Sequence, residues 1–386
     1  MQSNPSQRMT ENPFVTNGYA GPEYFCDRME ETRTLVELLT NGNNIALISP
    51  RRLGKTDLIH HCFQQPAIKD HYHTFTIDIY ATDSLRDFVH VFGKAILDAL
   101  KPQGRKAWEA FLAVLKSIRS EISFDIQGNP VWGIGIGALT PPDVTLDEIF
   151  EYLRTADKHC MVAIDEFQQI TRYNDHKNIE AALRTQIQRC PNANFIFSGS
   201  QRHLMGEIFV SPSRPFYQSV TIMNLHPIPL ESYCAFAEPM FSLNGGRHIE
   251  RQVVEDVYNR FHGITANIQK IMNLLYLKTQ PGDFCTLDKV DKAIESYLQL
   301  SSDTYETLLK QMPEKQRNVF LAIAAEERVR NISSGKFVHK YRLPSPSSVV
   351  SAVKGLLEKD FITHDTDEYY IYDQFFLLWI RKNVLA

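Results

Sequence analysis

The segment NIALISPRRLGKTDLIHHC, residues 44–62, constrains the fold more than any other part of the chain. An apolar run suited to a buried strand ends in a turn, and a helical pattern follows. The turn concentrates three cations, Arg51, Arg52 and Lys55, between the strand and the helix. A turn of this kind after a strand and before a helix is typical of α/β proteins that bind phosphate groups on a parallel sheet.

The turn follows the pattern G-x-x-x-x-G-K-[ST] at every place but the first, where Ser49 replaces glycine. Backbone N–H groups of such a turn point at phosphates, the lysine neutralises them, and the hydroxyl coordinates Mg²⁺. We therefore expect Lys55 on the terminal phosphates, Thr56 on the metal, and the two arginines facing phosphate or a neighbouring subunit. The alternative is a solvated basic turn before an ordinary helix. The expected nucleotide-binding residues of the turn are Ser49, Pro50, Arg51, Arg52, Leu53, Gly54, Lys55, Thr56 and Asp57.

A second motif, this one acidic, follows about 110 residues after the lysine, in CMVAIDEFQQI. Asp165 ends an apolar run, so it can reach the metal held by Thr56, and the adjacent Glu166 can polarise an attacking water. Alternatively, the acidic pair only begins a helix, where the helix dipole favours it. The order and spacing favour the functional interpretation, with Glu166 indicating hydrolysis.

The next strand candidate, NANFIFSGS, ends beside the acidic strand. Its polar tip, Ser200 or Gln201, is expected to sense the terminal phosphate or to hold the water, although Gly-Ser is also common in simple turns. An arginine should stabilise the transition state, in this chain or across a subunit boundary. The candidates are Arg202 and Arg214.

Strand and helix patterns alternate over residues 1–225, which predicts a parallel sheet covered on both faces. Helical patterns dominate residues 226–300, and short helices followed by a β-like pair end the chain. We therefore expect a core at 1–225 with a polar tail at about 1–12, a helical lid at 226–300, and a third domain at 301–386. The expected strands are 44–49, 73–82, 159–167 and 192–200, and the expected helices are 27–42, 58–63, 85–115, 146–156 and 179–189.

Composition restricts the setting of this protein. The chain has 386 residues, 43% of them hydrophobic, and a net charge of -4, which disfavours a surface that coats nucleic acid throughout. No apolar run reaches the length of a membrane span, so we expect a cytoplasmic protein that contacts no membrane. The cysteines are scattered without a CxxC pair, so we expect reduced core thiols and no zinc site.

These motifs in this order resemble the archaeal-type ATPase family of the AAA+/STAND lineage. The resemblance rests on F-x-D-R-x-x-E at 25–31, SPRRLGKT, VAIDEFQ, GSQRHLM, RPFY and YIYDQFFLLWIRK. It implies a P-loop ATPase core, a helical lid and a C-terminal winged helix. It also implies that Asp27, Arg28 and Glu31 lie on the adenine side. Residues 263–265 lack the proline that relatives carry at the start of a lid helix. Residues 218–219 lack the Gly-Arg that many relatives carry, and this absence favours Arg214 as the arginine finger.

The C-terminal segment is consistent with a winged helix. Helices are expected at 316–325, 335–340 and 347–359, with a wing formed by FITHDTDEYYIYD. Residues 347–359 would form the recognition helix, capped by serines and preceded by Pro346. Residues 301–386 hold 12 Lys+Arg against 11 Asp+Glu, so double-stranded DNA and a protein both remain open as partners. On that helix, Val349, Val350, Val353, Leu356 and Leu357 are expected to face the core, and Ser347, Ser348, Ser351 and Lys354 to be exposed.

Two other patterns carry less weight. WGIGIGAL, residues 132–139, lacks the helix that a dinucleotide fingerprint needs, so we expect a hairpin or edge strand. The histidines at 60–61 and at 71 and 73 lack metal-ligand spacing. The sequence therefore predicts an Mg²⁺-dependent ATPase that works as a conformational switch and is able to self-associate. The alternative is a nucleotide-gated DNA-binding regulator in which hydrolysis is incidental.

Overall fold

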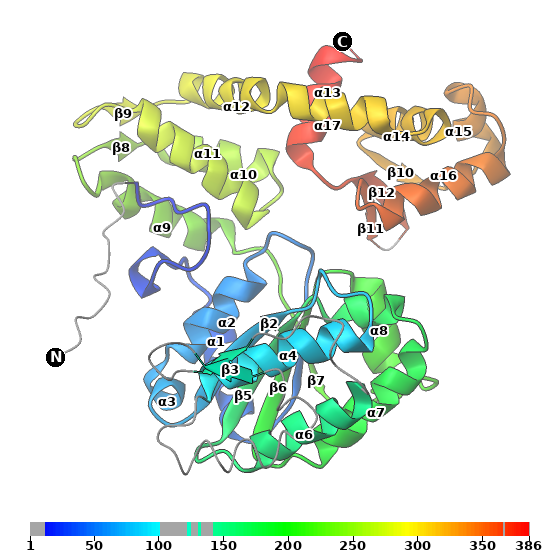
Figure 1. The fold of residues 1–386 in the computed structure, drawn as a ribbon. Helices are drawn as coiled ribbons and strands as arrows, with labels where there is room; N and C mark the ends of the chain where they lie inside the picture. The colour runs from blue at the N-terminus through cyan, green and yellow to red at the C-terminus, as the bar shows by residue number, and fades with distance from the viewer. Residues whose placement is uncertain (1–11, 101–121, 125–129, 133–141, 366, 386) are drawn as a thin grey trace. The chain divides into compact units, whose positions relative to one another are not determined.

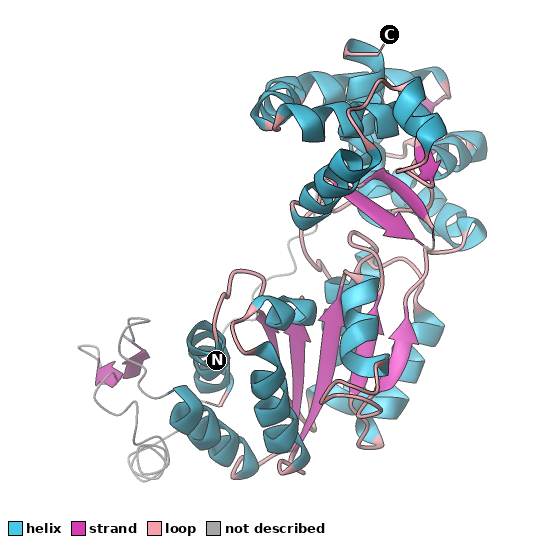
Figure 2. Cartoon of the chain, turned by 90° about the vertical axis from the view of Figure 1, so that its right-hand side faces the viewer, coloured by secondary structure: helices cyan, strands magenta, loops and turns pink. Residues whose placement is uncertain are grey.

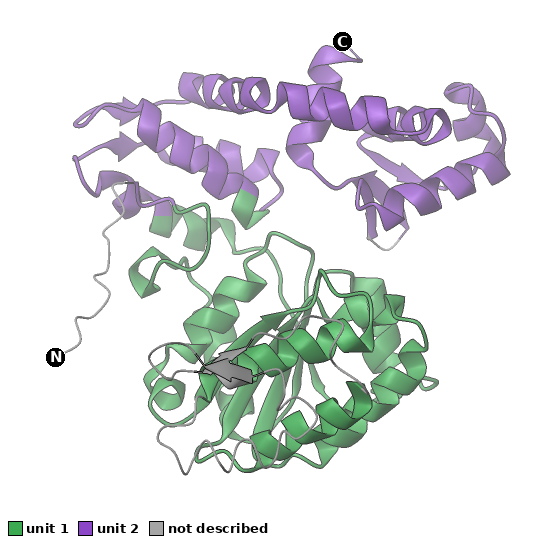
Figure 3. Ribbon diagram, viewed as in Figure 1, with its two compact units in different colours: residues 1–9, 15–236, 264–266 green, residues 10–14, 237–263, 267–386 purple. Residues whose placement is uncertain are grey.

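The computed structural model of the chain describes residues 12–100, 122–124, 130–132, 142–365 and 367–385 (Figure 1). The described residues form two compact units (Figure 3). The first contains Val15–Phe236 and Ile264–Ala266, and the second contains 12–14, Ala237–Gly263 and 267–385. The expected lid and C-terminal domain both fall mainly in the second unit, and the boundary between them stays a prediction.

The first unit is built on a five-stranded parallel sheet with the order β2-β5-β6-β1-β7. Four of these strands coincide with the four expected from the sequence. The fifth, β7, was not expected, because its residues are mostly exposed and form no buried apolar run. The strands are β1 (Ile45–Ile48), β2 (His73–Asp78), β5 (Cys160–Asp165), β6 (Ala193–Gly199) and β7 (Thr221–Asn224).

Helices cover both faces of this sheet, as expected (Figure 2). One face packs against α1 (Met29–Thr40), α2 (Lys55–Phe63) and α3 (Pro66–Lys69). The other packs against α4 (Leu85–Ala99), α6 (Pro142–Arg154), α7 (His176–Gln188) and α8 (Arg202–Val210). Short 3-10 helices, η1 (Pro22–Tyr24) and η4 (Phe167–Arg172), precede α1 and follow β5.

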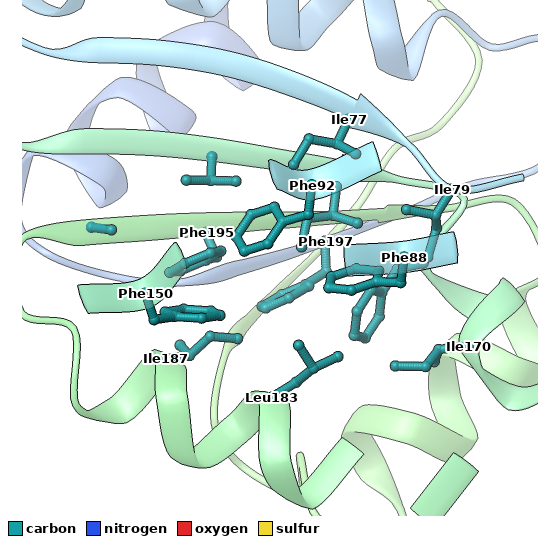
Figure 4. Packing of buried hydrophobic residues seen from close by; sticks show 14 of the residues in the cluster. Ile77, Ile79, Phe88, Phe92, Phe150, Ile170, Leu183, Ile187, Phe195 and Phe197 are labelled. Atoms are coloured by element: carbon teal, nitrogen blue, oxygen red, sulfur yellow. The ribbon is translucent and has the colours of Figure 1, made fainter. Parts of the chain in front are cut away.

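Alternation along the strands explains this three-layer arrangement. In β1, Ala46 and Ile48 belong to one core cluster and Ile45 and Leu47 to the other, because successive side chains of a strand point to opposite faces. Since both faces are covered, every residue of β1 is buried. One of the two cores is rich in phenylalanine (Figure 4), and each buried aromatic ring contributes roughly 2–3 kcal/mol to stability. These apolar contacts fix the positions of the strand ends.

Helices make up the first part of the second unit, in the region where a lid was expected. Its helices are α9 (Leu230–Ser242), whose first turns belong to the first unit, α10 (Arg251–Arg260), α11 (Thr265–Lys278), whose first two residues belong to the first unit, α12 (Asp288–Leu300) and α13 (Ser302–Gln311). Two short strands, β8 (His248–Ile249) and β9 (Phe284–Cys285), pair in parallel beside them.

A three-stranded sheet and four helices end the chain. The helices are α14 (Glu314–Glu326), α15 (Gly335–Lys340), α16 (Pro346–Glu358) and α17 (Gln374–Asn383), and the strands are β10 (Arg328–Arg330), β11 (Ile362–Asp365) and β12 (Glu368–Ile371). The three expected helices and the wing are thus confirmed. The Ser345 hydroxyl accepts from the Ser348 amide and caps α16.

One expectation for α16 is wrong. Val350 was expected to face the core, but it is 56% exposed. The apolar stripe of α16 is narrower than the sequence suggested, since Val349, Val353 and Leu356 are buried and Leu357 is half-buried. Val350 therefore lies on the outer face of the helix, near the exposed Ser351.

Some expected segments lie partly or wholly outside the described residues. The helix expected at 85–115 is described to Ala99, and the tail at 1–12 and most of WGIGIGAL lie outside the described residues. β3 (Ile122–Phe124) and β4 (Pro130–Trp132) pair antiparallel just before that segment. All six cysteines lie in the described residues, are buried and form no disulfide, as expected for reduced core thiols. Every helix in the described ranges is too short or too polar to cross a lipid bilayer.

Candidate functional site

The turn between β1 and α2 encloses the ammonium group of Lys55. This group donates to the carbonyls of Ser49 and Pro50 at 3.2 and 3.3 Å and lies 3.4 Å from the Ser49 hydroxyl. Lys55 is only 6% exposed. Burial lowers its pKa, and the charges of Glu166 and Asp165 act in the opposite direction. A buried ammonium bound to neutral carbonyls is a strong site for an anion, because an anion would stabilise its charged form.

The backbone of the turn accounts for serine at the first position of the motif. The residues of the turn with positive φ are Arg52, at 69°, and Gly54, at 86°, and Ser49 is not among them. Serine therefore causes no strain there, and the substitution does not weaken the turn. Gly54 has the conformation that glycine adopts most readily, directly before the first residue of α2.

A hydroxyl and a carboxylate meet beside the turn. Thr56 Oγ1 donates to Asp165 Oδ2 at 2.6 Å, although the two residues are 109 positions apart in the chain. The other carboxylate oxygen, Oδ1, accepts from Ser198 Oγ at 2.7 Å and from the Glu166 amide at 3.0 Å. Oxygen ligands of this kind fit Mg²⁺, which keeps part of its coordination shell for phosphate and water. Within the described residues no group of three or more His, Cys, Asp or Glu forms a metal site of its own.

Glu166 lies next to this pair, with its backbone in the left-handed region at φ 55°. Its Oε2 accepts from Ser200 Oγ at 2.7 Å and from the amide of Gln168. Its Oε1 is 4.0 Å from Arg51 Nε. The structure thus brings the acidic strand end, the tip of β6 and the phosphate turn together, because all three follow the carboxyl ends of adjacent parallel strands.

The two arginines of the turn have different surroundings. Arg51 is directed to the neighbouring strand ends, where its Nε donates to Ser200 Oγ at 3.2 Å and its guanidinium lies over the ring of Tyr80. The carbonyl of Arg52 accepts from the amide of Ala266, in the first turn of α11. The phosphate turn is therefore bonded both to the acidic residues and to the start of a helix that follows much later in the chain.

The segment expected on the adenine side also contacts the turn. Asp27 and Arg28 both have positive φ, at 54° and 66°. The Arg28 guanidinium is buried, donates to Glu31 at 2.7 Å and reaches the Leu53 carbonyl at 3.4 Å. Arg28 therefore packs against the phosphate turn.

The last predicted residue of the turn lies on the helix that follows. Asp57 belongs to the first turn of α2, where burial raises the pKa of its carboxyl.

The structure separates the two candidate finger arginines. Arg202 begins α8, directly after the tip of β6. Arg214 is buried, and its guanidinium forms ion pairs with Glu180, which is also buried, and with Glu207. Because two carboxylates engage this guanidinium, its position favours a structural role over contact with a phosphate. The preference for Arg214 came from motif order, which does not reveal burial.

Sequence reasoning missed two residues of the site. Ser198 was noticed only as part of a strand tip, although its hydroxyl binds Asp165. Gln168 was not singled out, yet its amide contacts both Glu166 and Ser200. Their polar side chains near the carboxyl ends of β5 and β6 were the available signal, but the contacts depend on strand order.

Solved structures of similar fold support the architecture. The Walker-type ATPase PABY2304 of Pyrococcus abyssi matches with a TM-score of 0.64 and 17% identity, over 96% of this chain and 99% of that one. The Aeropyrum pernix ORC2 protein, solved as ADPNP-ADP complexes, matches with a TM-score of 0.57 and 13% identity, over 97% and 98%. The Aeropyrum pernix ORC1 protein, solved in complex with DNA, matches with a TM-score of 0.56 and 10% identity, over 96% of both chains.

Residues 303–382 match the family described as "Probable winged helix domain". No curated protein matches the chain. The chain has the fold of a Walker-type P-loop ATPase with a C-terminal winged helix. The resemblance to archaeal ATPases that the motifs indicated is thereby confirmed at the level of fold.

Proposed function

We propose that the protein binds ATP together with Mg²⁺ at the turn between β1 and α2 and hydrolyses it to ADP and phosphate. The proposal rests on one observation, the convergence of the buried Lys55 ammonium, the Thr56–Asp165 pair and the Glu166 carboxylate at adjacent strand ends. Cation, metal ligands and a carboxylate for the attacking water are the parts that phosphoryl transfer to water requires.

Each of these residues has a distinct task in the proposed reaction. Lys55 neutralises the terminal phosphates, and the backbone of the turn orients them. Thr56 and Asp165 hold the metal, which when bound would offset phosphate charge. Glu166 orients the attacking water through its Oε1, because Oε2 is engaged by Ser200 and Gln168. Positive charge for the transition state comes from Arg202 or from a second copy of the chain.

We propose further that the nucleotide state is transmitted to the second unit. The Arg52 carbonyl accepts from the Ala266 amide within the first unit, and α11 continues from there into the second unit. A shift of the phosphate turn would therefore displace the first turn of α11. Within the second unit, the lid and the winged helix share an aromatic contact, since the Phe375 ring lies 4.7 Å from that of Phe261 and 4.2 Å from that of Tyr297. These contacts favour a lid and a winged helix that move together.

Replacing Lys55 by methionine tests nucleotide binding. Methionine keeps the length and the apolar part of the side chain but removes the charge. A hydrogen bond to a charged group contributes about 1.5–3 kcal/mol, so we expect the affinity for Mg²⁺-ATP to fall by roughly 10- to 150-fold. Titration calorimetry measures it directly. Lys310, paired with Glu306 on the exposed face of α13, offers a control, since Lys310→Met should leave the affinity unchanged. Wild-type protein that binds no ATP would overturn the proposal.

A nucleotide-gated DNA-binding regulator is the second candidate. In its favour are the winged helix and the ORC1 neighbour, whose structure was solved in complex with DNA. Against DNA binding, several cations of the winged helix are paired with carboxylates. Lys340 pairs with Glu326, and both Arg328 and Arg330 pair with Glu368. Such pairing reduces the charge available for a phosphate backbone and leaves a protein partner open.

Fluorescence anisotropy with a labelled duplex separates these candidates. A gated regulator binds the duplex with an affinity that differs between ATP, ADP and no nucleotide. Replacing Lys336, which is exposed on α15, by glutamine then weakens duplex binding by a few-fold at low salt. The control Lys310→Gln should have no effect. Absence of duplex binding in every nucleotide state would exclude the regulator and favour a protein partner.

A further inference from the structure

A cluster of polar side chains fills the space between η4 and the tip of β6. Its members are Glu166, Gln168, Ser200 and Arg51, and Gln168 is only 4% exposed. Buried amides of this kind are retained where they satisfy specific partners, since an unsatisfied buried amide destabilises the fold. The contacts of Gln168 therefore indicate what it does.

Gln168 uses both ends of its amide. Its Nε2 donates to Glu166 Oε2 and to the Ser200 hydroxyl, the latter at 3.3 Å. Its Oε1 accepts from the Ser200 backbone amide at 3.3 Å. The Ser200 hydroxyl in turn donates to Glu166 Oε2 at 2.7 Å. Gln168 thus links the acidic residue after β5 to the tip of β6 through backbone and side chain.

The local backbone makes this reach possible. The left-handed turn at Glu166 begins η4, so that residue 168 comes back toward the sheet. Gly199 leaves room for the amide, because a Cβ there would lie 2.6 Å from Gln168 Oε1 and would overlap the side chain of Met205. The close approach of Gln168 to the strand tip therefore depends on a glycine at 199.

The consequence concerns the two oxygens of the Glu166 carboxylate. Two donors engage Oε2, and Oε1 is the oxygen on the side of Arg51 and the phosphate turn. A glutamate side chain has several rotamers, and a pair of hydrogen bonds to one oxygen selects among them. An attacking water must be held in a narrow range of positions, so fixing this carboxylate contributes directly to rate.

We propose that Gln168 is a positioning residue, which fixes the Glu166 carboxylate and joins it to Ser200 so that Oε1 faces the attacking water. The inference rests on the proposed ATPase function and goes beyond it by assigning a role to a residue that makes no contact with phosphate or metal. Ser200 shares this role, as the second donor to the same oxygen.

Steady-state ATP turnover by the full chain tests this assignment. Gln168→Met removes the amide at similar volume, and we expect kcat to fall roughly 10-fold or more while KM changes less than about twofold. Gln169 provides the matched control, since it is the adjacent residue of η4, equally buried, and its amide donates to the Thr82 carbonyl instead. Gln169→Met should lose thermal stability to a similar extent while its kcat stays within about twofold of wild type.

A double-mutant cycle with Glu166→Gln separates positioning from general structural support. If Gln168 acts through Glu166, Gln168→Met produces no further loss of kcat in the Glu166→Gln background. The inference would be overturned if Gln168→Met lowered kcat as much in the Glu166→Gln background as in wild type, or if the Gln168→Met single variant kept the wild-type kcat. Either result would leave the proposed ATPase function standing. Should Gln168→Met fail to fold, Ser200→Ala must lower kcat in the same way while leaving KM nearly unchanged. Wild-type protein without turnover would overturn the proposed function, and this inference with it.

Discussion

Glu166→Gln is expected to lower ATP turnover by about 10²- to 10⁴-fold while leaving the affinity for Mg²⁺-ATP within a few-fold of wild type. The glutamine side chain keeps the shape of glutamate and still presents an oxygen to Ser200. It lacks the negative charge that orients and polarises water. The effect should therefore appear in kcat, because nucleotide binding depends mainly on Lys55 and Thr56.

The measurement is phosphate release under saturating ATP, combined with calorimetric binding. Glu151→Gln is a suitable control, since Glu151 lies exposed on α6 and pairs with Arg154 on the same helix. Turnover in Glu166→Gln equal to that of wild type would exclude the assigned role of the carboxylate. Loss of both affinity and turnover would instead assign Glu166 to nucleotide binding.

Arg214→Met is expected to destabilise the protein by about 3–5 kcal/mol, because removing one partner of a buried ion pair leaves the other charge unpaired. Glu180 is completely buried, and its carboxylate accepts two N–H groups of Arg214. Denaturant unfolding of the first unit measures the loss. The control is Glu207→Gln, which removes the half-exposed partner of the same arginine and should cost less than about 1 kcal/mol.

The loss of stability in Arg214→Met should depend on pH in a defined direction. Burial already raises the pKa of Glu180 above its ordinary value of 4.5, and Arg214 opposes that shift. In the variant the opposing contributions disappear, so the folded state binds the Glu180 proton still more tightly than the unfolded state does. Stability then falls as pH rises. We expect the difference from wild type to be smallest below pH 4.5 and largest at neutral pH.

The same variant addresses the arginine finger. If Arg214 is structural, folded Arg214→Met protein at a permissive temperature retains its kcat, whereas Arg202→Met loses activity when Arg202 is the finger in this chain. If neither variant loses activity, the charge comes from elsewhere, and an arginine of a second copy is the next candidate. A large loss of kcat in folded Arg214→Met would restore the preference that motif order first indicated.

Much of the core was predictable because its signals are local. Strands β1, β5 and β6 are fully buried runs of apolar residues, and β2 alternates buried with partly exposed side chains. Helices α1 and α7 follow helical periodicity. The edge strand β7 escaped prediction because its exposed side chains bear no hydrophobic pattern. Val350 was misassigned because a run of valines does not reveal how wide the buried face of a helix is.

The sequence alone determined which residue types stand at the ends of which strands: the cation-rich turn after β1, the acidic pair after β5 and the polar tip of β6. Such motifs are contiguous, so spacing and polarity suffice to find them. Only the tertiary structure decided how they combine. The order of parallel strands brought Asp165 to Thr56 and Ser198, and Glu166 to Gln168 and Ser200, and it buried Arg214 against Glu180. Contacts between residues far apart in the chain depend on strand order and on the packing of both sheet faces, which no local pattern encodes.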